Sequence, residues 1–179
     1  MPKSILIMDG DAITRALRRI AHEILEHNPD PTAFALIGIP SRGVELARRL
    51  ADLVKATEGR TPELGTIDIS MHRDDLSLRH TITSVQETHL PLQLEKFTIV
   101  LVDDVLYTGR TCRAAMDAIS SFGRPARIQL AVLLDRGHRE LPIRPDYVGK
   151  NLPTAKDEKV KVRLQNIDEQ PDSVRLERP

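Results

Sequence analysis

The chain has 179 residues, of which 29% are charged and 40% hydrophobic, as in globular domains that fold in water. Lys plus Arg equals Asp plus Glu, 26 each, so the net charge gives no sign of nucleic-acid binding, which would have to come from local clustering. The single cysteine excludes an internal disulfide, and no apolar run approaches the ~20 residues of a membrane span, so we expect one cytoplasmic domain over residues 1–179.

Residues 4–8 predict a short edge strand, and Asp9 or Asp11 can cap the helix that follows. In that helix apolar side chains recur every three or four residues and form one buried stripe: Ile13, Leu17, Ile20 and Ile24. Half a turn away lies a basic face with no acidic neighbour on it, made of Arg15, Arg18, Arg19 and His22. This face is either an ordinary solvated surface or a surface for phosphate groups, and the residues alone do not decide between the two.

Residues 34–39 form an apolar run that predicts a buried strand, and a helical pattern begins soon after it. Pro40-Ser41-Arg42-Gly43 joins the two, and the free backbone N–H groups at the start of a helix bind anions. The arginine adds a positive charge to that turn. In the alternative interpretation Gly43 serves only the backbone of a plain strand–helix turn.

Residues 64–71 alternate apolar and polar side chains, as in an exposed strand or a strand of a small hood. Residues 72–90 show no periodicity, and a loop of that length in a compact domain is usually a lid or disordered. Arg73 lies at the start of this loop. Asp74 and Asp75 follow it, as a metal pair or as part of a solvated loop.

The most informative stretch runs from residue 97 to residue 120. Thr98 to Val102 predicts a strand buried on both faces, Asp103 and Asp104 follow it, and a turn of small residues leads into a helix over residues 112–122. Ligands bind in open α/β sheets where strands end and helices begin. Free N–H groups and threonine hydroxyls in such a turn suit a phosphate, whereas adjacent carboxylates suit sugar hydroxyls or a hydrated Mg²⁺. The residues therefore indicate a phosphorylated sugar.

A second buried strand is predicted over residues 127–134. Its carboxyl end should lie beside that of the first, so Asp135 and Arg136 should line the same crevice. Basic residues follow, either as scattered solvent charges or as a second basic patch: His138, Arg139, Arg144 and Lys150. Short strands are expected over residues 147–149, 160–164 and 173–176.

Two stretches of the sequence resemble a known family. Val-Asp-Asp-Val-Leu-Tyr-Thr-Gly-Arg-Thr, residues 102–111, resembles the phosphoribosyl diphosphate (PRPP) motif of type I phosphoribosyltransferases. Asp-Arg-Gly-His-Arg-Glu-Leu-Pro-Ile-Arg, residues 135–144, closely resembles the PyrR family, and the resemblance extends from about Asp9 to Val162. It implies an α/β, Rossmann-like fold with a central, mostly parallel sheet flanked by helices, a small hood and a flexible active-site loop over residues 72–90.

The resemblance implies a uracil phosphoribosyltransferase, which converts uracil and PRPP, bound with Mg²⁺, to UMP and diphosphate. The catalytic positions that it implies are Arg42, Arg73, Asp103 and Asp104, with Mg²⁺ held through PRPP and not by protein ligands. The positions that would contact PRPP or UMP are Ser41, Arg42, Gly43, Asp103, Asp104, Val105, Leu106, Tyr107, Thr108, Gly109, Arg110 and Thr111. Asp135, Arg136 and the main chain near Val160 would form the uracil pocket.

The PyrR family also regulates pyrimidine operons through RNA, in response to UMP or UTP. The resemblance therefore implies a homo-oligomer, a dimer or larger, that binds an RNA hairpin of a pyrimidine-operon leader. The basic residues of both segments would form its RNA surface: Arg15, Arg18, Arg19, His22, His138, Arg139, Arg144 and Lys150.

The chain departs from the family pattern at four of these or neighbouring positions. Ser41 replaces the commoner Thr, His72 a Tyr and Pro145 an Ala, while Arg18 stands where relatives carry other residues. Two alternatives remain beside the main interpretation. One is an RNA-binding regulator with vestigial catalysis, and the other is a purine phosphoribosyltransferase. The sequence of residues 135–144 argues against the purine enzyme.

Overall fold

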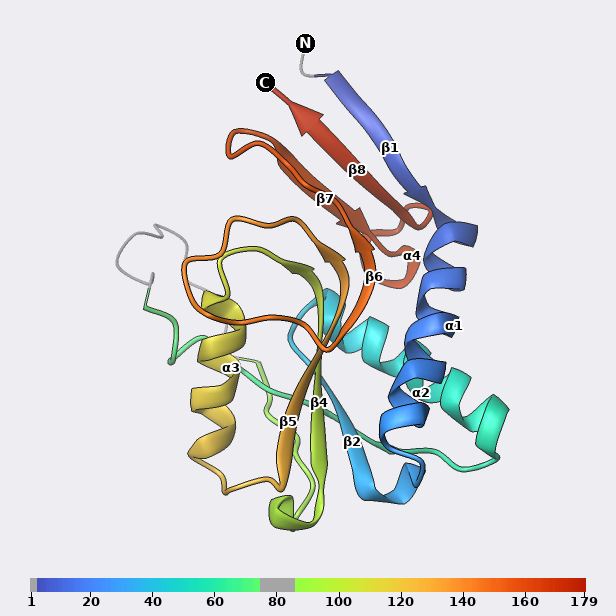
Figure 1. Ribbon diagram of the computed structural model, residues 1–179, viewed down its shortest axis with the longest axis vertical. Coiled ribbons are helices and arrows are strands. Elements are labelled where there is room, and N and C mark those ends of the chain that lie inside the picture. Colours follow the sequence, from blue (N-terminus) through green and yellow to red (C-terminus); the bar gives the residue numbers. More distant parts are fainter. Residues whose placement is uncertain (1–2, 75–85) are drawn as a thin grey trace.

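The computed structural model describes residues 3–74 and 86–179 (Figure 1). Its elements in chain order are β1 (Lys3–Asp9), α1 (Gly10–His27), the 3-10 helix η1 (Pro31–Ala33), β2 (Phe34–Gly38), α2 (Arg42–Glu58), β3 (Glu63–Thr66), the 3-10 helix η3 (Leu94–Lys96), β4 (Thr98–Leu106), α3 (Arg110–Ser120), β5 (Arg127–Asp135), β6 (Tyr147–Asn151), β7 (Lys159–Arg163), α4 (Gln165–Asp168) and β8 (Ser173–Arg178). Within the two described ranges, no helix is long and apolar enough to cross a membrane.

Five parallel strands form the main sheet, in the order β3-β2-β4-β5-β6. All five residues of β2 are buried, and so are Ile99 to Val102 of β4. Strands that are apolar on both faces need a cover on both faces, which the helices provide. The expected α/β fold with a central parallel sheet is confirmed.

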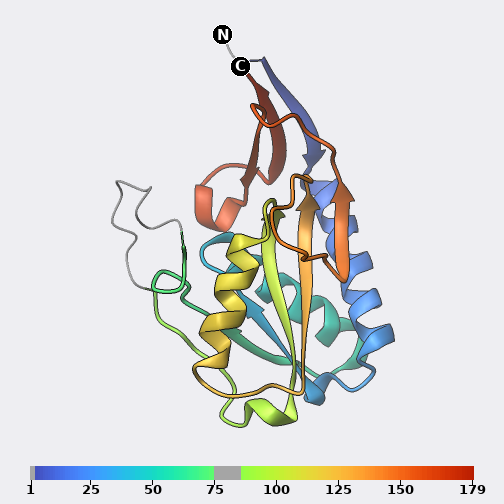
Figure 2. The same ribbon diagram turned by 60° about the vertical axis from the view of Figure 1, so that its left-hand side comes forward.

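The helices divide the core into two layers, one on each face of the sheet. Helices α1 and α2 cover one face and α3 covers the other (Figures 1 and 2). Alternate residues of a strand point to opposite faces, so Leu36 and Val100 join the α1–α2 core, whereas Ile37 and Leu101 join the α3 core. The apolar stripe predicted for α1 is buried, with exposed fractions of 0 to 3%.

Three antiparallel strands, in the order β1-β8-β7, form a separate small sheet, which we call the hood. It stands beyond the carboxyl ends of the main strands, and it contains β1 and β8, the first and last strands of the described chain (Figure 1). The expected edge strand β1 lies at one side of the hood, and the Asp9 carboxylate caps α1 by accepting a hydrogen bond from the Ala12 N–H at 2.8 Å.

Three boundaries differ from the sequence analysis. The strand expected over residues 64–71 ends at Thr66 and lies at the edge of the main sheet, because Ile67 and Ile69 turn into the α3 core. Strand β4 continues to Leu106, since β5 extends beside it as far as Asp135. Of the loop expected over residues 72–90, residues 75–85 lie outside the described part of the chain, and His89 pairs with Thr66 through two backbone hydrogen bonds of 2.9 Å.

Candidate active site

The carboxyl end of β4 and the turn after it open onto a cavity of about 460 Å³. Asp103 lines this cavity, as does every residue from Val105 to Thr111. Arg73, at the start of the expected lid, also lines it, as do Leu130 and Val132 of β5. The structure thus brings together most of the residues that the sequence analysis assigned to one phosphorylated ligand.

Two adjacent carboxylates, Asp103 and Asp104, are half-buried at the end of β4. The Asp104 N–H donates to the Asp103 carboxylate at 2.9 Å, and the Val105 N–H donates to the Asp104 carboxylate at 2.8 Å. Burial raises the pKa of Asp103 well above its usual value, and the charge of Asp104 raises it further, whereas Arg73 acts in the opposite direction. An ionised Asp103 is therefore costly in free energy, which indicates a ligand-binding role and not a packing role.

The turn between β4 and α3 has the geometry of an anion site. Gly109 has a φ of 94°, in the left-handed region that glycine adopts without strain, and α3 begins at the next residue. The Arg113 N–H donates to the Gly109 carbonyl at 3.0 Å, and the Arg110 N–H donates to the Thr108 hydroxyl at 3.3 Å. The amides of Thr111 and Cys112, between them in the first turn of α3, are the ones that face a ligand. Those amides, the positive end of the helix dipole and the threonine hydroxyls are complementary to a phosphate.

The segment after β5 folds back onto this turn and holds it in place. The Thr108 carbonyl accepts hydrogen bonds from the N–H groups of Glu140 at 2.9 Å and Leu141 at 3.2 Å. Arg110 forms an ion pair with Glu140 at 3.1 Å and another with Asp74, which also lies 3.3 Å from Arg113. The Asp74 carboxylate thus bridges two arginines of α3, a contact that neither of the sequence interpretations anticipated.

The first turn of α2 packs directly against the end of β4. A Cβ atom on Gly43 would lie 2.3 Å from the Val102 carbonyl oxygen, so only glycine allows this approach. The Pro40–Ser41 peptide is cis, and Ser41 immediately precedes the first residue of α2. The close packing places Arg42 beside the strand end that carries Asp103. Arg42 is bonded to Asp168 of α4, with Nη2–Oδ1 and Nε–Oδ2 distances of 2.6 and 3.2 Å.

Asp135 and Arg136 lie at the carboxyl end of β5, but neither lines the 460 Å³ cavity as the sequence analysis expected, and both are bound by other protein groups. The Arg136 guanidinium lies 4.1 Å from the centre of the Tyr107 ring and donates to the hydroxyl of Thr154 and to the carbonyl of Glu158. These contacts fix the segment that leads into β7. Val160 stands two residues beyond Glu158, in strand β7 of the hood.

The Asp135 carboxylate accepts hydrogen bonds from the Gly137 N–H and from Arg139. Arg139 donates further to the carbonyls of Tyr107 and Ile143, both at 2.8 Å. Its guanidinium thereby ties the ends of β4 and β5 to the segment between β5 and β6. His138 is likewise half-buried, with a ring nitrogen against the Thr154 carbonyl.

The basic residues of α1 and of β6 meet at one surface. Arg15, Arg19 and Lys150 line a hollow of about 210 Å³ between the two elements, which we call the basic hollow. Arg19 donates to the carbonyls of Val148, at 3.1 Å, and Gly149, and lies 3.5 Å from Glu23. The expectation of a face without an acidic neighbour was therefore wrong. Arg18 and His22 are exposed on the same helix, and Arg144 is exposed in the segment before β6.

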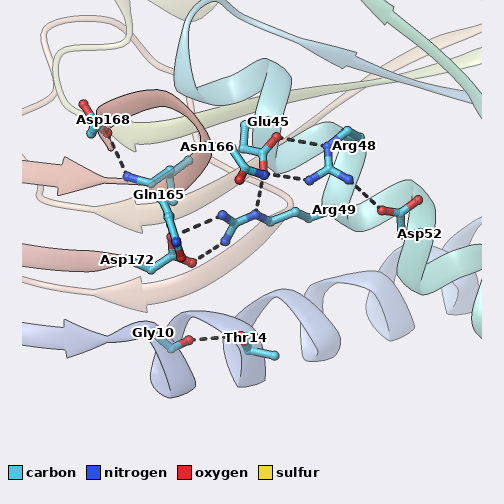
Figure 3. A network of polar contacts seen from close by, with 11 residues as sticks. Gly10, Thr14, Glu45, Arg48, Arg49, Asp52, Gln165, Asn166, Asp168 and Asp172 are labelled. Carbon is cyan, nitrogen blue, oxygen red and sulfur yellow. Dashed lines mark hydrogen bonds and ion pairs between the residues drawn. The ribbon is translucent and has the colours of Figure 1, made fainter. Parts of the chain in front are cut away.

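Sequence reasoning missed a polar cluster that joins α2 to the residues after β7 (Figure 3). Glu45 is only 8% exposed and accepts hydrogen bonds from Arg48, Arg49 and Asn166, while Arg49 also pairs with Asp172. Burial raises the pKa of Glu45, but these hydrogen bonds outweigh burial and hold the pKa at about 2. Glu45 pairs with Arg48 and Arg49 at the local helical spacings of three and four residues. No local pattern announces the contacts of Asn166 and Asp172, because these residues lie more than 120 positions from their partners in α2.

Cys112 also lines the 460 Å³ cavity without having been singled out. Burial raises the pKa of its thiol to about 12, with smaller contributions from Asp103 and Asp146. Because the thiolate is the nucleophilic form, this cysteine is unsuited to covalent catalysis. Its role is to pack α3 against the main sheet.

Comparison with known proteins assigns this architecture to a family. Residues 7–167 match the family model described as the phosphoribosyl transferase domain. The Bifunctional protein PyrR of Bacillus mycoides (strain KBAB4) is 51% identical over 172 residues, which cover 95% of this chain and 96% of the relative. The protein of the same name from Pelotomaculum thermopropionicum is 57% identical over 162 residues, or 90% of each chain.

Solved structures show the same fold at much lower identity. The hypoxanthine phosphoribosyltransferase of Trypanosoma cruzi superposes with a TM-score of 0.71 at 17% identity, covering 97% of this chain and 96% of that chain. A hypoxanthine-guanine phosphoribosyltransferase from Bacillus anthracis gives a TM-score of 0.69 at 15% identity, with 98% of both chains covered. These two similarities establish the fold, which is the type I phosphoribosyltransferase fold expected from the sequence.

Proposed function

Because the chain belongs to the PyrR family of bifunctional proteins and carries a phosphoribosyl transferase domain, we propose that it transfers the phosphoribosyl group of PRPP to uracil. The products are UMP and diphosphate. One observation carries the proposal: the end of β4 presents Asp103 and an anion-binding turn to a single cavity of about 460 Å³, with the loop of Arg42 packed against the same strand end.

PRPP has three parts, and each has a matching group in the site. The 5-phosphate binds the turn from Val105 to Thr111, where helix amides and threonine hydroxyls converge. Asp103 and Asp104 accept hydrogen bonds from the vicinal ribose hydroxyls. Arg42, with Ser41 and Gly43 in the same loop, binds the diphosphate, and Arg73 approaches from the lid side.

Catalysis in such a site depends on position and charge. The transition state combines a ribosyl cation with a departing diphosphate, so groups that hold the sugar and neutralise the leaving group accelerate the reaction. Asp104 holds the ribose near the reacting carbon, and Arg42 and Arg73 stabilise the charge that develops on diphosphate. No side chain is assigned as a general base.

Magnesium is the cofactor we propose, bound together with PRPP. Hard oxygen donors suit Mg²⁺, and the carboxylates of Asp103 and Asp104 offer such donors through water or through the sugar hydroxyls beside the diphosphate site. When bound, Mg²⁺ supplies positive charge that neutralises the diphosphate.

Uracil binds at the carboxyl end of β5. The segment of Asp135 and Arg136 and the backbone near Val160 supply the polar groups that read the base edge, and Tyr107 supplies an adjacent ring. The amino-acid sequence of residues 135–144, which resembles that of the PyrR family, favours uracil over a purine as the substrate.

We further propose that the protein binds an RNA hairpin of a pyrimidine-operon leader, as a cytoplasmic regulator that responds to UMP or UTP. The specific observation is the basic hollow, where two segments 130 residues apart bring Arg15, Arg19 and Lys150 together. We assign to the same RNA surface the exposed residues Arg18, His22 and Arg144, together with His138 and Arg139. A hairpin is larger than one such hollow, which favours a homo-oligomer that presents several copies.

The test is PRPP-dependent nucleotide formation with Mg²⁺, with uracil, hypoxanthine and guanine offered in parallel. UMP should form from uracil alone, and Asp104→Asn should lower its rate at least about a hundredfold, because the ribose loses a charged hydrogen-bond acceptor. No product with any base, together with tight UMP binding, would instead favour a regulator whose catalysis is vestigial. Product from hypoxanthine or guanine would assign a purine substrate.

A further inference from the structure

A carboxylate of the hood holds the arginine that we assign to the diphosphate. Asp168, the last residue of α4, receives two hydrogen bonds from Arg42, one from Nη2 at 2.6 Å and one from Nε at 3.2 Å. The Arg42 and Asp168 side chains are 34% and 19% exposed. A two-point contact of this kind fixes both the position and the plane of a guanidinium.

Asp168 is itself firmly held. Its Oδ2 atom accepts a hydrogen bond from the N–H of Leu164 at 2.8 Å, and Leu164 is completely buried. The segment around it is docked along α2 by two further contacts, Asn166 with Glu45 at 2.8 Å and Asp172 with Arg49 (Figure 3). Positions 42, 45 and 49 follow the spacing of one face of a helix, so α2 is attached to the hood along a single line.

The contact leaves one side of the guanidinium open. Asp168 takes the side formed by Nε and Nη2, whereas Nη1 and the second hydrogen of Nη2 form the other side. In the described part of the chain, no hydrogen bond engages Nη1 of Arg42. Two parallel N–H groups match two oxygens of a diphosphate, and they need no rearrangement if the opposite side is already fixed.

We propose that Asp168 is the positioning residue of the diphosphate site, which holds Arg42 so that its free side faces the diphosphate of PRPP. This inference depends on the proposed function, since it requires Arg42 to bind diphosphate. It adds that α4, in the connection between the hood strands β7 and β8, determines the orientation of the first side chain of α2.

A competing role for Asp168 predicts the opposite change in diphosphate affinity when its carboxylate is removed. If Asp168 merely occupied Arg42 as a substitute anion, its removal would free the guanidinium and strengthen diphosphate binding. The structure favours positioning, because the buried backbone of Leu164 anchors Asp168 and the carboxylate engages only one side of its partner.

Asp172 provides a matched control. It forms the same kind of ion pair between the hood and α2, with Arg49, and the side chains of Asp172 and Asp168 are 16% and 19% exposed. Asp168→Asn and Asp172→Asn therefore remove one carboxylate charge each from equivalent surroundings, but only the first change releases Arg42. Melting temperatures of both variants measure the loss of stability that they share.

The experiment titrates magnesium diphosphate into each protein by calorimetry and measures KM for PRPP and for uracil. Asp168→Asn should weaken diphosphate binding and raise KM for PRPP about tenfold, with KM for uracil unchanged, whereas Asp172→Asn should change all three less than about twofold. In an Arg42→Ala background, Asp168→Asn should have no further effect on diphosphate binding. Asp168→Glu, which keeps the charge but displaces it, should weaken diphosphate binding about threefold. This variant replaces Asp168→Asn in the experiment if the asparagine variant folds poorly.

Three results would overturn the inference alone: equal effects of the two asparagine variants, an undiminished effect of Asp168→Asn without Arg42, or tighter diphosphate binding by Asp168→Asn. If the native protein neither binds diphosphate nor forms nucleotide, the proposed function fails and this inference fails with it.

Discussion

The paired carboxylates at the end of β4 illustrate how a binding site opposes stability. Successive residues of a strand point to opposite faces, yet Asp103 and Asp104 remain close enough for the charge of one to raise the pKa of the other. Burial adds the larger part of that increase. A folded chain with both groups ionised is therefore less stable than one with Asp103 neutral, and a ligand with hydroxyl donors would remove part of this cost.

Asp103→Asn should therefore stabilise the free protein at pH 8 by about 1–2 kcal/mol while lowering UMP formation at least about tenfold. The raised pKa means that the folded protein binds a proton more tightly than the unfolded chain, so the charge of Asp103 reduces stability increasingly as pH rises above its unfolded value of about 3.9. Denaturant unfolding at pH 8 and pH 5 measures the difference in stability between Asp103→Asn and the native protein.

The gain in stability should shrink at the lower pH, where the native Asp103 takes up a proton and becomes neutral like asparagine. A gain that is the same at both pH values, or a loss at pH 8, would contradict the assigned cause.

At the scale of elements, α2 is the helix that joins the parts of the molecule. Its amino end packs on β4 at Gly43, its buried face contributes to the α1–α2 core, and a polar face binds the segment after β7. Glu45 is the centre of that polar face and is almost completely buried. A buried carboxylate is stable only when it is fully hydrogen-bonded, as this one is.

Glu45→Gln should destabilise the protein by about 1–3 kcal/mol at pH 7, because Arg48 and Arg49 lose a charged partner. Asp52→Asn is the control: Asp52 pairs with Arg48 at 2.9 Å but is 66% exposed, so its loss should cost about 0.5 kcal/mol or less. Denaturant unfolding at constant ionic strength measures the change in unfolding free energy for both variants.

The pH dependence gives an independent check of the Glu45 assignment. Its pKa is lowered in the folded protein, to about 2, so its contribution is complete above the unfolded pKa of about 4.3 and disappears as pH falls toward 2. The difference between the native protein and Glu45→Gln should follow that course, and a difference that grows on acidification would be inconsistent with it.

The site and the fold differ in how far the sequence predicted them. The strands, the helices and the turns at Arg42 and Gly109 follow from periodicity and from glycine placement, which are local properties. The strand boundary at Leu106 and the place of β3 depend on which strand lies alongside, and Asp168 and Asp172 depend on contacts across more than 120 residues. No local pattern carries that information, so only the folded chain reveals it.

At the scale of the whole molecule, the basic hollow and the 460 Å³ cavity are lined by entirely different residues. The hollow lies between α1 and β6, whereas the cavity lies between β4, β5 and α3. Two separate surfaces suit two activities in one chain.

Arg15→Ala should weaken binding of a leader-RNA hairpin about threefold to tenfold and reduce the slope of log affinity against log salt concentration by about 1, because one phosphate contact is lost. Arg124→Ala, an exposed arginine in the segment between α3 and β5, is the control and should leave the slope unchanged. Filter binding over a range of salt concentrations measures both. Equal losses in the two variants would mean that the protein attracts RNA only through overall charge.

The hood has a consequence for biosynthesis. Among the described residues, strand β1 pairs with β8 alone, so a strand that is made early waits for a partner that is made much later. The main parallel sheet can assemble from residues 34–151 during translation, whereas the hood can close only after residue 178 has been made. A chain released before β8 would have an intact sheet but an unpaired β1, a free edge that invites aggregation. The hood therefore forms after the main sheet, even though its strand β1 is made early.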